Sequence, residues 1–191
     1  MPYHHGDLRR ALLDTALEAI EEQGPAAVSL RDVARRAGVS HAAPTHHFRD
    51  KTALLTALAA EGWSLLADAL REAAADGGEF AELGVAYVVF ATSHPAHFAV
   101  MRAPGLARAD DPDLEAAMGR ASAEMRSGVR RFEAGSTRDA DTTSLAAWSL
   151  VHGLASLVLE GNVDPGTDVA ALARQVTAQL RPDVTAGHRG P

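Results

Sequence analysis

The chain has 191 residues, a formal net charge of −7 at pH 7 and no cysteine, which excludes disulfide bonds and thiolate metal sites. Its hydrophobic content is dominated by Ala and Leu, a mixture that favours helices. The sequence has no apolar run of the roughly twenty residues that a membrane span needs, and its polar, His-rich start is unlike a signal peptide. These features predict an all-α, soluble, cytoplasmic protein without a membrane segment.

The first predicted helix covers residues 7 to 23, where apolar residues recur on one face. Two short helices joined by a glycine turn are expected between residues 29 and 51. Ser29 is the expected N-cap of the first short helix, and Gly38 is the residue expected to turn the chain. Ser40 is the expected N-cap of the second, which should last barely two turns.

These two short helices fit either an ordinary helical hairpin or a DNA-binding helix-turn-helix. Residues 25 to 51 carry five cationic and two acidic side chains, although the whole chain is acidic. A local basic excess is typical of a surface that meets a phosphate backbone. Lys51 is the only lysine and stands at the expected start of a long helix, where backbone N–H groups favour an anion. The alternative for Lys51 is a solvated surface charge.

Helical patterns continue to residue 180, over residues 51 to 75, 79 to 93, 96 to 102, 112 to 134, 137 to 160 and 164 to 180. The helix that ends at Glu160 is apolar nearly all round, so it needs partners on two sides. We expect one side to meet the domain core and the other a second subunit. Residues 139 to 160 and 164 to 180 of two chains would then form a four-helix interface, with Gly153 and Leu157 inside it.

The segment from Asp7 to about Leu55 resembles the DNA-binding domain of the tetracycline-repressor (TetR) family of bacterial transcriptional regulators. Two positions depart from the family pattern: Pro44 stands where an aliphatic residue is usual, and Thr45 where a tyrosine often contacts phosphate. Trp148 to Gly153 and the run from 94 to 101 resemble a family subgroup with a Trp–His–Gly signature. The residues that match in the N-terminal segment are Ala11, Leu12, Ala16, Gly24, Ser29, Leu30, Val33, Ala34, Ala37, Gly38, Val39, Ser40, His47, Phe48, Lys51 and Leu54.

The resemblance implies an all-α fold in which residues 1–50 form a three-helix, helix-turn-helix DNA-binding domain. Residues 51–181 would form a helical ligand-binding and dimerisation domain, and residues 182–191 a flexible tail. It also implies a homodimer that binds a double-stranded DNA operator and most often represses transcription. We expect base edges to be read by Ser40, His41, Ala42 and His46, and phosphates to be contacted by Ser29, Thr45, His47 and Lys51.

A ligand site is expected in the helical body, on faces that should turn inward. The combination of adaptable methionines with polar atoms of His and Trp suggests an apolar or aromatic small-molecule effector with one or two hydrogen-bonding groups. The alternative is that these side chains are simply core. The candidates are Phe90, His94, Met101, Met118, Met125, Trp148 and His152.

The nine histidines do not combine into a metal site. His46 and His47 are adjacent and would point about a hundred degrees apart on a helix. His94 and His97 are better spaced but lack carboxylates positioned to complete a tetrahedral set. No serine elbow, phosphate loop or His-Glu metal motif is present, so we expect no catalytic residue, metal or cofactor. A helical small-molecule binding protein without operator binding is the alternative function, suggested by Pro44 and Thr45.

Overall fold

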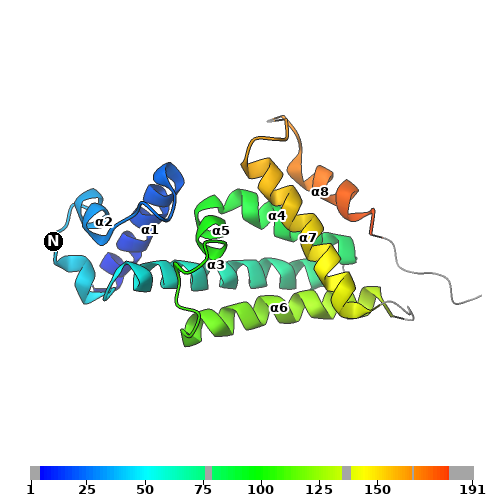
Figure 1. Ribbon diagram of the computed structural model, residues 1–191, viewed down its shortest axis with the longest axis horizontal. Helices are drawn as coiled ribbons and strands as arrows, with labels where there is room; N and C mark the ends of the chain where they lie inside the picture. Colours follow the sequence, from blue (N-terminus) through cyan, green and yellow to red (C-terminus); the bar gives the residue numbers. More distant parts are fainter. Residues whose placement is uncertain (1–4, 76–78, 135–138, 165, 181–191) are drawn as a thin grey trace, which may run out of the picture. The chain divides into compact units, whose positions relative to one another are not determined.

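The structure is a computed structural model that describes residues 5–75, 79–134, 139–164 and 166–180 (Figure 1). Every regular element in these ranges is helical, as predicted. The helices are α1 (His5–Gln23), α2 (Leu30–Arg36), the single 3-10 turn η1 (Ala43–His46), α3 (Lys51–Ala74), α4 (Phe80–Ser93), α5 (Pro95–Met101), α6 (Pro112–Phe132), α7 (Ala140–Leu159) and α8 (Val169–Thr177). The predicted flexible tail lies outside the described residues.

The last helix starts later than predicted. Asp164 was expected to begin it, but its carboxylate accepts a hydrogen bond from the Gly166 amide at 2.9 Å and closes a turn. Asp168 is the N-cap instead, and its side chain accepts from the Ala171 amide at 3.0 Å. Both aspartates suit a helix start. The turn that includes Gly166 decides between them.

The chain divides into two compact units, and each is described by itself. Unit 1 consists of residues 1–63 and 94–118, and unit 2 of residues 64–93 and 119–191. Helices α3 and α6 therefore contribute residues to both units. The predicted boundary after residue 50 was placed between two expected functions rather than between compact units, and it stays a prediction.

The core of unit 1 joins the first three helices to a later part of the chain. Helix α1 packs against both α2 and α5, and Leu106 and Ala107 of the loop between α5 and α6 pack against the same core. The large buried side chains pack away from water and provide most of the stabilising free energy. The buried residues of this core are Leu12, Leu13, Ala16, Ala19, Ile20, Val28, Val33, Phe48, Leu54, Leu55, Leu58, Ala59, Ala96, Val100 and Leu114.

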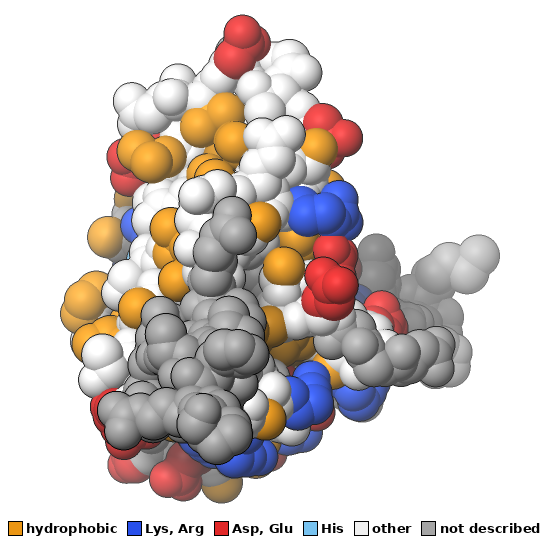
Figure 2. Space-filling view, turned by 90° about the vertical axis from the view of Figure 1, so that its right-hand side faces the viewer, with side chains coloured by type: hydrophobic (Ala, Val, Ile, Leu, Met, Phe, Trp, Pro, Cys, Tyr) orange, Lys and Arg blue, Asp and Glu red, His pale blue; other side chains and the backbone are white. Residues whose placement is uncertain are grey.

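In unit 2, α4 is the central helix and packs against α7 and α8. Gly84 permits this close packing, because a Cβ at that position would lie 3.0 Å from Val151 Cγ1 and closer still to Thr177 Cγ2. Helix α7 buries only part of its apolar surface. Its exposed large side chains are Leu145, Trp148, Leu157 and Leu159. Hydrophobic side chains also reach the surface on the side of the molecule drawn in Figure 2.

Among the described helices, α3 and α7 are long and apolar enough to cross a membrane by length and composition alone. This corrects the sequence-based expectation that no segment approaches a span. That expectation considered only uninterrupted apolar runs. A helix that is interrupted by Ser, Thr, Gly and a few charged residues can still be apolar on average. In the folded chain α3 is half buried, and its Glu61 accepts hydrogen bonds from Arg10 of α1 at 2.8 and 2.9 Å.

Candidate nucleic-acid interface

The first half of the predicted helix-turn-helix forms as expected. The Ser29 hydroxyl caps α2 by accepting a hydrogen bond from the Asp32 amide at 3.2 Å. After α2, Gly38 adopts a positive φ of 67°, which a residue with a side chain rarely tolerates. The Val39 amide then donates to the Ala34 carbonyl at 3.0 Å and closes the turn.

The second half differs from the prediction. The segment from Ser40 to Phe48, here called the reading segment, contains only the 3-10 turn η1. The N-cap of η1 is Ala42 rather than Ser40, and it makes no side-chain hydrogen bond to the turn. Pro44 lies at the start of η1 and is buried; it lacks an amide donor, and its ring disfavours the α conformation of the preceding residue. The Phe48 amide donates to the Pro44 carbonyl at 2.8 Å, and the buried Phe48 ring anchors the end of the segment.

The predicted base-reading side chains lie at the surface of unit 1. Ser40, His41, Ala42 and His46 are all exposed. Thr45 is exposed too, but its hydroxyl donates to the Ala42 carbonyl at 2.7 Å, and His47 is half-buried. Ser40, His41, Ala42 and His46, called the exposed set below, are therefore accessible, and base reading by them stays a prediction.

Lys51 begins α3, as predicted, but its ammonium group already has a partner. Nζ donates to the backbone carbonyl of Ala26 at 2.6 Å and ties the start of α3 to the turn between α1 and α2. An ammonium group has three donors, so this bond leaves donors for a phosphate. Phosphate binding by Lys51 stays a prediction.

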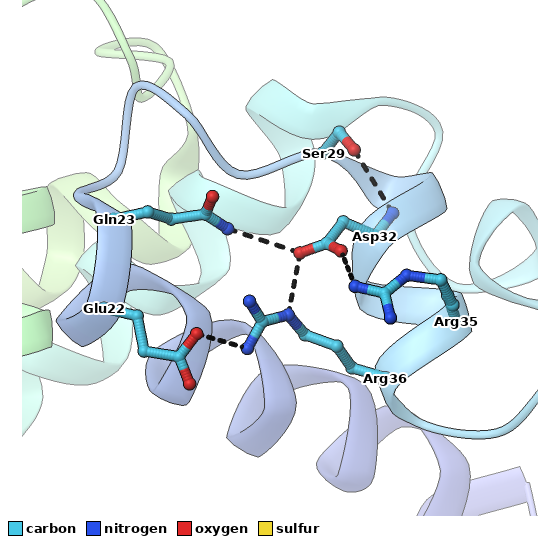
Figure 3. A network of polar contacts seen from close by, with 6 residues as sticks. All are labelled: Glu22, Gln23, Ser29, Asp32, Arg35 and Arg36. Atoms are coloured by element: carbon cyan, nitrogen blue, oxygen red, sulfur yellow. Dashed lines mark hydrogen bonds and ion pairs between the residues drawn. The ribbon is translucent and has the colours of Figure 1, made fainter.

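A polar network fixes α2 against α1 (Figure 3). Asp32 accepts hydrogen bonds from Arg35, from Arg36 Nε at 2.8 Å and from Gln23 at 3.3 Å. Arg36 also pairs with Glu22 of α1 at 2.7 Å. The hydrogen bond from Arg35, followed by that from Arg36, lowers the pKa of Asp32. This network therefore engages Arg35 and Arg36, two of the five cations counted in the sequence, which a charge count along the chain does not reveal.

Asp50 brings a further cation to this surface that sequence reasoning missed. One carboxylate oxygen caps α3 by accepting from the Ala53 amide at 2.8 Å. The other accepts from Arg108 at 2.6 Å and from Arg49 at 3.3 Å. The pKa of Asp50 is lowered, mainly by the bond from Ala53 and then by the two arginines. No local spacing signals the pair, because 58 positions separate Asp50 from Arg108.

The seven predicted ligand residues fall in both units. In unit 2, the Tyr87 hydroxyl lies 2.8 Å from His152 Nδ1, and the Trp148 and His152 rings are 5.3 Å apart. Phe90 is buried and Met125 half-buried. Tyr87 was not predicted, although its position in the apolar stretch of α4 is a signal that could have found it.

In unit 1, His94 and Met101 are half-buried, and Met101 packs at Gly62, where a Cβ would lie 2.7 Å from its sulfur. The expectation that all seven side chains turn inward is wrong for Met118 and Trp148, which are 41% and 46% exposed. Each lies on a helix face that the described residues cover only in part. Among the described residues, no group of three or more His, Asp or Glu side chains could hold a metal ion.

Comparison with known families accounts for both parts of the chain. A model described as "Bacterial regulatory proteins, tetR family" matches residues 12–58, and one described as "Tetracyclin repressor-like, C-terminal domain" matches residues 80–180. The chain belongs to the TetR family. TetR-family regulators are cytoplasmic proteins, not enzymes, that bind operator DNA and act as dimers. The Trp–His–Gly subgroup stays a prediction.

Individual relatives and solved structures show how far the similarity extends. The HTH-type transcriptional regulator BetI of Escherichia coli O139:H28 (strain E24377A / ETEC) is 47% identical over 62 residues, which span 32% of this chain and 32% of BetI. A solved protein of unknown function from Rhodococcus sp. RHA1 is 37% identical, with a TM-score of 0.75. The match covers 94% of this chain and 96% of the Rhodococcus chain. The putative regulatory protein SCO4313 is 27% identical, with a TM-score of 0.74, and the match covers 94% of this chain and 98% of the SCO4313 chain.

Proposed function

We propose that this protein is a cytoplasmic, dimeric transcriptional repressor that leaves its operator when a small molecule binds. The observation that carries the proposal is the family match over residues 12–58, which includes a turn at Gly38 followed by the exposed side chains of Ser40, His41, Ala42 and His46. This is the arrangement through which a helix-turn-helix presents side chains to the major groove.

Base reading in this proposal comes from Ser40, His41, Ala42 and His46. Phosphates are contacted by Lys51 and His47, with Ser29 and Thr45 contributing less because both hydroxyls already take part in bonds within the unit. Ala42 can contact a thymine methyl, and the imidazoles can bond to purine edges. Phosphate contacts fix the register of the protein on the duplex, whereas contacts to base edges select the sequence.

The dimer forms through α7 and α8. Leu145 and Leu157 are 59% and 48% exposed in the single chain, although apolar side chains of this size gain stabilising free energy by leaving water. Gly153 lies between them along α7, and a Cβ there would meet no atom within 4 Å. A second copy of α7 can therefore approach closely at Gly153 while the leucines become buried.

The effector binds near Tyr87, Trp148 and His152 in unit 2. These side chains combine aromatic surface with a hydroxyl and an imidazole in contact with each other. An apolar or aromatic molecule with one or two hydrogen-bonding groups suits this chemistry. Its binding favours a conformation with lower operator affinity, so the ligand shifts a population rather than competing with DNA.

The test is a mobility-shift and fluorescence anisotropy experiment with the DNA upstream of the protein's own gene. A specific, salt-dependent complex that dissociates with an effector found by thermal-shift screening supports the proposal. A protein that binds small molecules but no DNA of any sequence would instead be a helical binding protein. That second function is favoured by the engaged hydroxyl of Thr45 and by the single 3-10 turn around Pro44.

A further inference from the structure

The loop between α5 and α6 is attached to the start of α3. Arg108 donates from its guanidinium to Asp50 at 2.6 Å, and its backbone amide donates to the Thr56 hydroxyl at 2.9 Å. Thr56 is only 3% exposed, and its hydroxyl in turn donates to the Thr52 carbonyl at 2.7 Å. Because Leu106 packs against the core of unit 1, the loop places the Arg108 side chain by apolar contact as well as by hydrogen bonds.

Asp50 has two effects on an approaching DNA backbone. Its carboxylate caps α3 through Ala53, which stabilises the helix that starts at Lys51. It also places a negative charge directly after the reading segment and beside Lys51, where a phosphate would be repelled. The cap therefore needs a nearby cation if this end of α3 is to meet DNA.

Two arginines face Asp50, and they differ in how firmly they are held. The Arg49 side chain is 76% exposed and its Nε lies 3.3 Å from the carboxylate. The Arg108 side chain is 32% exposed, lies at 2.6 Å, and belongs to a backbone that is bonded to a buried hydroxyl. An exposed, mobile arginine loses side-chain entropy when it pairs, whereas a pre-positioned one loses less. Arg108 is therefore the more firmly held counter-charge of Asp50.

We propose that Arg108 is a positioning residue for DNA binding, which neutralises Asp50 so that the start of α3 can approach the phosphate backbone. The role rests on the proposed DNA-binding function. Arg108 acts through Asp50 rather than by touching DNA. Its removal is harmful only while the Asp50 carboxylate is charged.

The test is a double-mutant cycle on the full-length protein, with operator affinity measured by fluorescence anisotropy at several salt concentrations. Asp50→Asn keeps an oxygen for the cap while removing the charge. We expect Arg108→Gln to weaken binding by about three- to tenfold at low salt, where a charge within the ~10 Å screening length is felt. The double variant Asp50→Asn/Arg108→Gln should bind within about twofold of Asp50→Asn alone, because the coupled partner is gone.

Two further variants separate this role from a general effect on folding. Arg108→Lys retains a cation and should restore most of the affinity lost in Arg108→Gln. Asp111→Asn is the matched control, because Asp111 also accepts hydrogen bonds from the amides that open a helix, at 3.1 Å, and has no ion-pair partner among the residues that the structure describes. Its operator affinity should equal that of the wild type. Thermal unfolding of each variant verifies that the chains compared are folded.

The proposal would be overturned if Arg108→Gln weakened operator binding as much in the Asp50→Asn background as in the wild-type protein. Arg108 would then act independently of Asp50. In that case a fall of about one in the salt slope would identify a direct phosphate contact. Failure of the wild-type protein to bind any DNA is a different result, which would overturn the proposed function itself and this role with it.

Discussion

The Lys51 ammonium group lies 2.6 Å from the backbone carbonyl of Ala26, 25 positions earlier in the chain. The bond holds together two parts of unit 1, the first turn of α3 and the turn between α1 and α2. It also places the protein's only lysine at the helix end where the macrodipole attracts anions. Lys51 therefore has a structural contact in the free protein in addition to its predicted contact with phosphate.

Replacing Lys51 by Ala should weaken binding to all DNA sequences about equally and reduce the salt slope by about one, because one phosphate contact is lost. It should also lower the melting temperature slightly, because the Ala26 carbonyl loses its partner. Anisotropy titrations on operator and random DNA, together with thermal unfolding, measure both effects. Unchanged affinity for the operator would show that Lys51 serves only the fold.

Substituting Arg for Leu157 or Gly153 should produce monomers. Both positions lie on the exposed face of α7, and an interface there would bury an unpaired charge. Analytical ultracentrifugation measures the result, with Ala123→Arg on an exposed position of α6 as the matched control. A dimer that persists in both α7 variants would mean that another surface forms the interface.

Stability should fall on mild acidification because of His97. This imidazole is 5% exposed, and its Nε2 lies 3.4 Å from Glu61, near Arg10 and His94. Burial lowers the pKa of His97 below its ordinary value of 6.5, and the attraction of Glu61 opposes this only in part. Below pH 6.5 the unfolded chain takes up a proton that the folded chain resists. The stability is present above that pH and is lost as the pH falls from there toward the lower pKa of the folded state.

Urea unfolding across that pH range measures this effect. His97→Gln should flatten the profile between pH 7 and the lowered pKa, whereas His41→Gln, at an exposed position, should retain the wild-type profile. A wild-type slope that survives in His97→Gln would assign the proton uptake to another group.

Gly84→Ala should destabilise unit 2 by about 1–3 kcal/mol, because the added methyl group must displace Thr177 or Val151 in a packed region. Gly119→Ala is the matched control on α6, where a Cβ meets nothing within 4 Å. That change should instead stabilise the helix by about 0.5–1 kcal/mol. Differential scanning calorimetry compares the two variants. Similar melting temperatures would contradict the close packing of α4 against α7 and α8.

Most helices could be predicted from local signals. The apolar spacing in α1, α3 and α6 and the caps at Ser29 and Gly38 depend on neighbouring residues only, so the sequence contains the information. The start of α8 was missed because Asp164 and Asp168 are equally good caps in isolation. The short form of η1 was missed because Ser40 was expected to open a helix of barely two turns. Pro44 lacks an amide donor, and its ring restricts the residue before it.

The candidate site was predictable only where it is local. The exposed set of Ser40, His41, Ala42 and His46 follows from the turn at Gly38. The contacts of Asp50 with Arg108 and of Tyr87 with His152 join residues 58 and 65 positions apart, and no periodicity encodes such pairs. Trp148 lies on an apolar helix, but whether it faces inward depends on which neighbours pack against that helix, and this is decided only by the tertiary fold.

The core of unit 1 includes Ala96, Val100 and Leu114 from a second stretch, which thirty intervening residues separate from Trp63. Consider a chimera with a single crossover, in which residues 1–63 of this chain are joined to the remainder of a different regulator. The apolar side chains of its N-terminal part would then pack against residues of the other protein. Exchange of DNA specificity between relatives therefore requires that residues 1–63 and 94–118 are transferred together. Alternatively, the exchange can be confined to the surface residues of the reading segment, which leave the shared core unchanged.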